Sequence, residues 1–212
     1  MAEKILTEEP IKMPADYILQ DPVPEGAGVP AALIYKLDSR LAAAELLCFA
    51  GPEERSLPFT SELSIVETVR RITKGTRTAI IEAGRGMSRT GMTYAYCITK
   101  HEYYEKGDAF TCMEYTLDMN IDFPDLNWFI NGSFLETGSS IDRDAEVLES
   151  IARERFGSFD RAVEIWKRDP YDPELRDGLL MSYSDRAEFD ERYPGHPLSK
   201  IRELVRFITR NN

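Results

Sequence analysis

The sequence predicts an α+β fold: an antiparallel β-meander of four to six strands, packed by one helix before it and several helices after it. Two observations predict it. Between residues 78 and 138, short segments rich in Thr, Tyr, Phe and Ile follow one another across short loops, which favours antiparallel neighbours. After residue 140, apolar residues recur at the three- and four-residue spacing of amphipathic helices.

The N-terminal part begins with residues 1–30, which carry five prolines among acidic residues and glycines. Because proline fixes φ and removes a backbone donor, this segment is expected to be an extended arm, lying on the domain or loose in solvent. Residues 31–37 predict a strand. Residues 40–50 are ambiguous, since Ala and Leu favour a helix while the short length permits a hairpin with 31–37. Residues 61–74 predict a helix capped by Ser61 or Ser64.

Residues 31–212 are expected to form a single domain. Within it, predicted strands give way to a C-terminal helical part at about residue 141. Strand candidates before that point are 78–83, 91–104, 108–121 and 127–138. Helix candidates after it are 142–156, 158–168 and 196–212, with one short helix near 185–193. We expect the helix at 61–74 and the C-terminal helices to pack on one face of the sheet. The last helix carries an apolar stripe that includes Leu204, which should dock on the domain; alternatively the helix projects and binds a partner.

Composition limits the function classes. The 212 residues carry a formal net charge of −11, which repels nucleic acid and anionic membrane surfaces. The N-terminus has no basic start followed by an apolar core, and no run is long enough to span a bilayer. The odd count of three cysteines favours reduced, mostly buried thiols over a disulfide framework. These features predict a cytoplasmic protein.

Two resemblances concern the whole chain rather than a site. The order of helix, meander and helix resembles the α/β sandwich of the PsbP-like proteins, which implies helices packed against an antiparallel sheet. The ending "DPYDPELRDGLLMSYSDRAEFDERYPGHPLSKIRELVRFI" is similar to that of an uncharacterised bacterial family of small intracellular proteins. This second resemblance implies a bacterial origin and no particular activity.

The segment "TAIIEAGRGMSRTGMTYAYC", residues 78–97, resembles the phosphate-binding loop of protein tyrosine and dual-specificity phosphatases. In that family a cysteine thiolate attacks phosphorus while backbone amides and an arginine hold the phosphoryl oxygens. Counting back from Arg89, Ala83 stands at the nucleophile position and Glu82 at that of the family's histidine. Since alanine cannot attack, the resemblance predicts no phosphatase. An anion site at Arg85 and Arg89 stays open, and the favoured interpretation is a turn between strands, with glycines at positive φ.

Tyrosines concentrate on the predicted hairpin. Tyr94 and Tyr96 should lie on one side of their strand, because alternate residues share a face. The purely structural interpretation is that these tyrosines form cross-strand pairs within a half-buried sheet. The functional interpretation is an exposed patch that is surrounded by acidic residues and binds a basic protein. The patch would consist of Tyr94, Tyr96, Tyr103 and Tyr104.

The sequence offers no complete motif for a metal site or for a catalytic histidine. Asp118, Asn120 and Asp122 alternate like the start of a calcium loop, but Phe123 and Phe129 stand where that loop needs glycine and glutamate. Polar side chains on the solvent face of a strand produce the same spacing. His101 and His196 are the two histidines, and neither shows the spacing of a zinc helix.

With no assembled catalytic set and no cofactor motif, the sequence favours a non-enzymatic, protein-binding role such as that of an immunity or adaptor protein. The expected partner is another protein, basic in charge, rather than nucleic acid or a membrane. The alternative is an enzyme or a small-ligand- or anion-binding domain with a site around the 84–91 loop. A deep pocket that gathers His101, Arg89 and a carboxylate would favour this second class.

Overall fold

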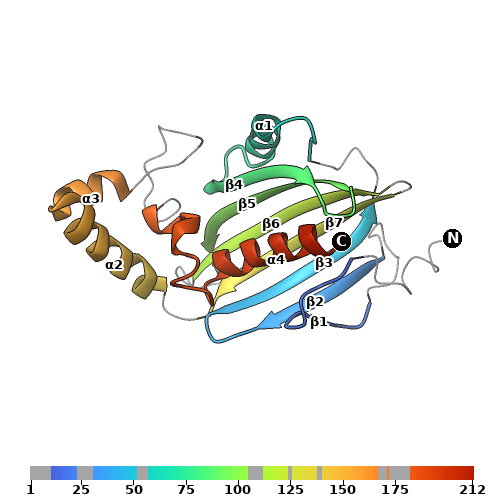
Figure 1. The fold of residues 1–212 in the computed structure, drawn as a ribbon, viewed down its shortest axis with the longest axis horizontal. Helices are drawn as coiled ribbons and strands as arrows, with labels where there is room; N and C mark the ends of the chain where they lie inside the picture. The colour runs from blue at the N-terminus through green and yellow to red at the C-terminus, as the bar shows by residue number, and fades with distance from the viewer. Residues whose placement is uncertain are drawn as a thin grey trace.

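The computed structural model describes residues 11–22, 31–51, 57–104, 112–123, 126–137, 140–166, 171 and 182–212. This part of the chain folds into one antiparallel sheet with a helix on each face (Figure 1). The α+β class predicted from the sequence is confirmed.

The sheet has seven strands within the described ranges, in the order β1-β2-β3-β7-β6-β5-β4, and every neighbouring pair is antiparallel. The strands are β1 (Ile18–Leu19), β2 (Ala32–Asp38), β3 (Ala42–Gly51), β4 (Thr78–Met87), β5 (Thr93–Tyr103), β6 (Cys112–Phe123) and β7 (Leu126–Glu136). The predicted meander is β4 to β7, and β3 extends the sheet by pairing with β7. The ambiguous segment 40–50 is a strand, in a hairpin with β2. The strand beyond the predicted four to six is the short β1, which comes from the arm.

Helices α1 (Glu62–Ile72) and α4 (Pro197–Asn211) lie on opposite faces of the sheet, so the expectation of a single covered face is wrong. Leu204 of α4 packs in the core that contains Ile98 of β5, whereas Val69 of α1 packs in a separate core with Cys97. Neighbouring strand residues face opposite sides. Strand β5 is apolar on both sides, so its sequence pattern does not identify one buried face. We call the two sides the α4 face and the α1 face.

The C-terminal helical part begins beyond one end of the strands (Figure 1). Helix α2 (Ser140–Ile151) continues as a π-helical turn, Ala152–Phe156, and is followed by α3 (Phe159–Trp166). These elements share a small core that includes Val147, Ala162 and Trp166. The short helix expected near 185–193 is instead two 3-10 turns, Tyr183–Asp185 and Ala187–Phe189.

Part of the predicted arm lies on the domain. Ile11 and Tyr17 are buried in the core of the α4 face. The backbone N–H of Lys12 donates a hydrogen bond to Oδ1 of Asn212, at 2.7 Å. Residues 1–10 and 23–30 of the arm lie outside the described residues. Within the ranges that the structure describes, no helix combines the length and the apolar composition needed to cross a membrane.

Buried charges join the C-terminal part to the α4 face. Lys100 of β5 is 2% exposed, and its Nζ lies 3.2 Å from Oδ2 of Asp185. Arg202 of α4 pairs with Asp190 at 3.0 Å and with Glu82 of β4 at 2.6 Å. A buried charge is costly unless it is paired and hydrogen-bonded, and these pairs meet that condition. We call these residues the buried ionic network. We interpret it as structural, because Lys100, Asp185, Arg202 and Asp190 are each less than 10% exposed, while Glu82 is 29% exposed.

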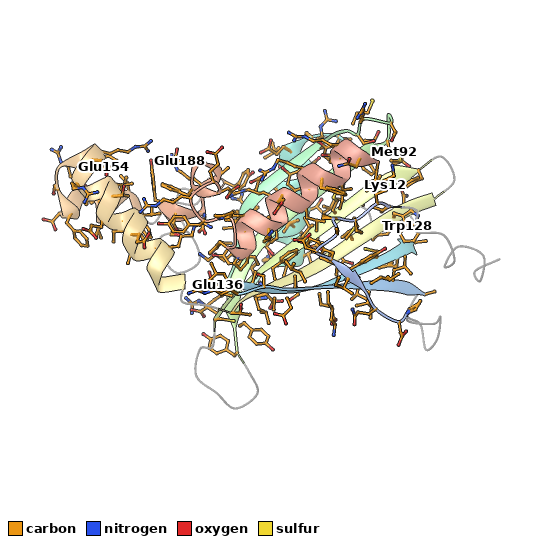
Figure 2. The ribbon with its side chains drawn as sticks, turned by 60° about the horizontal axis from the view of Figure 1, so that its bottom comes forward. Lys12, Met92, Trp128, Glu136, Glu154 and Glu188 are labelled. Atoms are coloured by element: carbon orange, nitrogen blue, oxygen red, sulfur yellow. The ribbon has the colours of Figure 1, made fainter. Side chains whose placement is uncertain are left out.

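Glu136 lies at the end of the sheet where α2 begins (Figure 2), and His196 completes this junction by pairing with it. Its Nδ1 accepts the N–H of Leu198, capping α4, so its Nε2 carries the proton and donates to Glu136 at 2.8 Å. Burial lowers the pKa of His196 well below its usual value, and the charges of Arg143, Lys100 and Arg202 act in the same direction while Asp185 opposes them. A second proton on Nδ1 would face the Leu198 donor, so the neutral ring belongs to the folded state.

Candidate functional site

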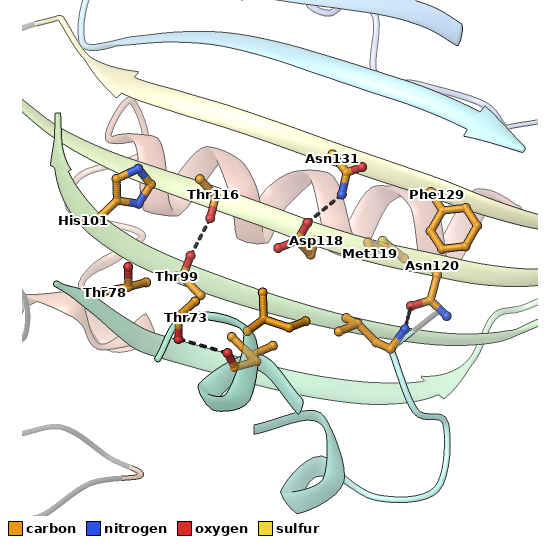
Figure 3. Close-up of a pocket in the computed structure, with 13 residues that line it drawn as sticks. Thr73, Thr78, Thr99, His101, Thr116, Asp118, Met119, Asn120, Phe129 and Asn131 are labelled. Atoms are coloured by element: carbon orange, nitrogen blue, oxygen red, sulfur yellow. Dashed lines mark hydrogen bonds between the residues drawn. The ribbon is translucent and has the colours of Figure 1, made fainter. Parts of the chain in front are cut away.

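A pocket of about 340 Å³ lies on the α1 face, between α1 and the strands β4 to β7 (Figure 3). Its volume is within the range of small-molecule sites in proteins. The apolar lining residues are Leu57, Val69, Ile72, Met119 and Phe129, and the polar residues are Thr73, Thr78, Thr99, His101, Thr116, Asp118, Asn120 and Asn131. An apolar wall with a few convergent polar groups is the usual composition of a ligand site.

Strand periodicity builds the polar floor. Thr116, Asp118 and Asn120 alternate on β6 with the buried Leu117 and Met119, so the three polar side chains share the α1 face. The strand alternation is as expected, but the solvent-face interpretation is wrong for Asn120, which is 1% exposed because Leu57 and α1 cover part of this face. The backbone N–H of Leu57 donates to Oδ1 of Asn120 at 2.9 Å, which ties that segment to the floor.

Hydrogen bonds across the strands fix the floor (Figure 3). The hydroxyls of Thr99 on β5 and Thr116 on β6, which are register partners, lie 2.5 Å apart. Nδ2 of Asn131 on β7 donates to Oδ1 of Asp118 at 2.6 Å. The pocket floor is therefore held by paired side chains from three adjacent strands before any ligand binds.

Asp118 forms no ion pair with any of the residues that the structure describes. Burial raises the pKa of its carboxyl group, and the hydrogen bond from Asn131 only partly opposes that effect. No lysine or arginine occurs among the pocket-lining residues that the structure describes. Its register partner Cys97 is fully buried, and burial first, then the charges of Asp118 and Glu82, raise the pKa of that thiol. The carboxylate is thus partly desolvated beside a neutral thiol.

Asn120 carries a second unsatisfied group. The residue is 1% exposed, and its Nδ2 has no hydrogen-bond partner within the described part of the chain. The amide orientation is set by Leu57, whose N–H requires the oxygen as acceptor. A buried donor without a partner costs about 1–3 kcal/mol. An acceptor atom supplied by a ligand would remove that cost.

A third polar group lies at the other end of the pocket. Nε2 of His101 lies 2.8 Å from Oε2 of Glu114, and Ser133 donates to the other carboxylate oxygen. The hydrogen bond with His101 is the main cause of the lowered pKa of Glu114. Glu114 is therefore ionised at neutral pH and orients the imidazole ring.

The spacing of these groups favours binding over hydrolysis. Glu114 and Asp118 are four residues apart on β6, which separates their Cα atoms by about 13 Å. The two carboxylates are also engaged with different partners, Glu114 with His101 and Ser133, and Asp118 with Asn131. The hydroxyls of Thr99 and Thr116 bond to each other rather than to a base, so neither is activated as a nucleophile. Within the described residues, no group of three or more His, Cys, Asp or Glu side chains could hold a metal ion.

The two arginines of the predicted anion site lie outside this pocket. Arg85 is exposed on β4, and its Nη1 donates to the carbonyl of Phe59 at 2.8 Å. Arg89 is exposed in the turn that follows, and the chain resumes as a strand at Thr93, as the hairpin interpretation predicts. The backbone N–H groups of residues 88–91 all donate to carbonyl oxygens. The turn therefore forms no backbone nest for an anion.

The glycines of this segment differ in role from the prediction. Gly91 has a φ of 91°, as a turn glycine should, but Gly84 and Gly86 lie within β4. A Cβ on Gly84 would lie 2.5 Å from the ring of Tyr96, and one on Gly86 would lie 2.7 Å from the hydroxyl of Tyr94. These two glycines make room for tyrosine rings rather than supplying positive φ.

The predicted tyrosine patch is divided between two faces. Tyr94 and Tyr96 stack at 6.4 Å and pack against the core of the α4 face, on the same side as expected. Strand alternation places Tyr103 on the opposite face. Tyr104 is exposed beyond the end of β5, and its hydroxyl donates to Glu102. The four side chains therefore do not form one continuous surface.

Replacing Asp118 with asparagine is expected to raise the free energy of unfolding at pH 7 by about 1 kcal/mol, within the range of single stabilising changes. The pKa of Asp118 is raised in the folded state. Its contribution to stability is therefore present at low pH and is lost as the pH rises and the carboxyl group ionises. Asparagine stays neutral and can still accept the hydrogen bond from Asn131.

Urea unfolding at several pH values tests this expectation. The advantage of Asp118→Asn should shrink as the pH falls through the raised pKa of Asp118, and it should be absent below about pH 4, the ordinary pKa of an aspartate. A variant that is less stable than the wild type at pH 7 would show that the carboxylate is not a strained group.

Comparisons with known proteins leave this site as the main source of functional information. A scan against models of known protein families found no match, and a search of curated protein sequences found no significant similarity.

Proposed function

We propose that the protein is a binding protein whose pocket under α1 takes a small polar organic molecule. One observation carries the proposal: the carboxylate of Asp118 lines the same preformed pocket as the amide of Asn120, whose Nδ2 has no hydrogen-bond partner among the described residues. Both groups are energetically unfavourable in the absence of a partner. Groups of this kind concentrate at functional sites, where binding compensates their cost.

The pocket meets part of the criterion that favours a ligand-binding domain. It contains His101 and a carboxylate, but Arg89 lies elsewhere. The protein-binding role expected from composition and tyrosine content is the weaker hypothesis, because its four tyrosines do not share a surface. The position of the proposed site also differs from the 84–91 loop, since the pocket floor comes from β5, β6 and β7.

The proposal is tested by filling the pocket. Thr78 lines it from the edge strand β4 and is only partly buried, so Thr78→Trp should occupy the cavity without disturbing the core. Met87→Trp is the matched control, because Met87 is 70% exposed on the same strand and does not line the pocket. Amide chemical shifts are measured for both variants and the wild type with a fragment set of alcohols, amides, amines and carboxylates.

We expect fragments to shift the amides of Thr99, Thr116 and Asn131 in the wild type and in Met87→Trp, and to leave them unshifted in Thr78→Trp. Shifts that survive pocket filling would place binding elsewhere. A fragment set that moves none of these amides in the wild type would contradict a ligand-binding role for the pocket.

A further inference from the structure

Among the described residues, the charge that lines the pocket itself is negative. Asp118 belongs to its lining and Glu114 lies next to His101, while the residues that line it include no lysine or arginine. Arg85, the cation of β4 on the same face, is bound to the carbonyl of Phe59. An anionic ligand would add a third negative charge to a partly desolvated site, whereas a cation would supply the missing counter-charge.

The hydrogen-bonding capacity of Asp118 is mostly unused. A carboxylate offers about four acceptor positions, and the described residues fill one of them, through Asn131. Thr116 lies two residues away on the same face, roughly 7 Å along the strand. An ammonium group has three donors, so it can bind the carboxylate and a threonine hydroxyl together. Charge-assisted bonds of this kind are the strong ones.

Asn120 follows Asp118 by two residues along β6, on the same face but in the direction away from Thr116. Its Nδ2 is a donor and therefore requires an acceptor. Leu57 and Phe129 supply an apolar surface beside both groups. We propose that the ligand is an organic ammonium cation that also carries an uncharged acceptor oxygen and an apolar group, as in a hydrophobic amino alcohol. The inference rests on the proposed function of the pocket and assigns the charge of its ligand.

Three probes of one shape test this assignment. Phenylalaninol carries an ammonium group, 3-phenylpropane-1,2-diol has a hydroxyl in its place, and 3-phenyllactate carries a carboxylate. Calorimetry and amide chemical shifts are measured for the wild type, Asp118→Asn and Asp122→Asn. Asp122 is the matched control, because it is exposed on the same face of β6 and does not line the pocket. Its replacement by asparagine changes the net charge by the same amount as Asp118→Asn.

We expect phenylalaninol to bind the wild type at least about tenfold more tightly than the diol, and 3-phenyllactate to bind most weakly. Asp118→Asn should bring the amine and the diol to similar affinities, while Asp122→Asn should keep the preference. Thermal unfolding of both variants checks that each one is folded.

Three results would overturn the inference in different ways. Equal binding of the amine and the diol to the wild-type pocket would mean that the ligand site exists but does not select a cation. An equal loss of preference in both variants would assign the selection to net charge rather than to Asp118. If neither probe shifts the amides of the pocket, both this inference and the proposed function fail.

Discussion

Leu204→Ala is expected to lower the free energy of unfolding by about 2–5 kcal/mol, the usual cost of truncating a leucine in a packed core. Leu204 is fully buried in the middle of α4, in the core that the helix forms with the sheet. For a chain of this size the loss corresponds to a fall in the unfolding midpoint of roughly 4–20 °C. The docked helix excludes the alternative in which the apolar stripe projects to bind a partner.

Glu203→Ala provides the control for this measurement. Glu203 is the preceding residue, and its side chain is 59% exposed in an ion pair with Lys200. Exposed pairs contribute at most about 1 kcal/mol, so this variant should unfold close to the wild-type midpoint. An unshifted midpoint for Leu204→Ala would mean that α4 is not docked in solution.

Lys100→Met should cost about 3–5 kcal/mol, because it leaves the charge of Asp185 buried without its partner. Asp185 is 4% exposed, and the attraction of Lys100 helps to keep its pKa below the usual value despite burial. Adding Asp185→Asn should restore part of the lost stability, since the amide oxygen can still accept the N–H of Ser182 that Asp185 now accepts. Coupling between the two changes is the expected signature of a direct pair.

Lys36→Met is the matched control for Lys100. Lys36 and Glu45 also form a cross-strand ion pair, at 3.4 Å, but both side chains are more than half exposed. Urea unfolding should therefore report a change below about 1 kcal/mol for this variant. If Lys100→Met were equally mild, the buried ionic network would not be what holds the C-terminal part to the sheet.

The sequence predicts the elements of this fold better than their packing. The spacing of Val69 in α1 and Leu204 in α4 identifies both helices, because amphipathic periodicity is a local property. The side of the sheet that each helix covers depends on the apolar residues on both faces of β5. Gly84 and Gly86 are typical of a turn by composition, yet the rings of Tyr94 and Tyr96 place them in a strand.

The candidate site shows the same limit. The alternation of Asp118 and Asn120 places both on one face of a strand, and that much follows from the sequence. Their environment does not, since the N–H that Asn120 accepts comes from Leu57, 63 positions earlier, and α1 then covers part of the polar row. The burial of Lys100 is equally hidden in the sequence. Nothing local distinguishes it from a surface lysine, because its partner Asp185 is 85 positions away.

The pocket and the buried ionic network lie back to back on the same strands. On β5, Thr99 and His101 line the pocket while Lys100 between them faces α4; on β6, Thr116 lines the pocket while Tyr115 is buried on the other side. The residues of the proposed ligand site and the residues that hold the fold therefore alternate along these strands. The proposed specificity can diverge at Thr99 or Thr116 without loss of the ion pairs that hold the C-terminal helices.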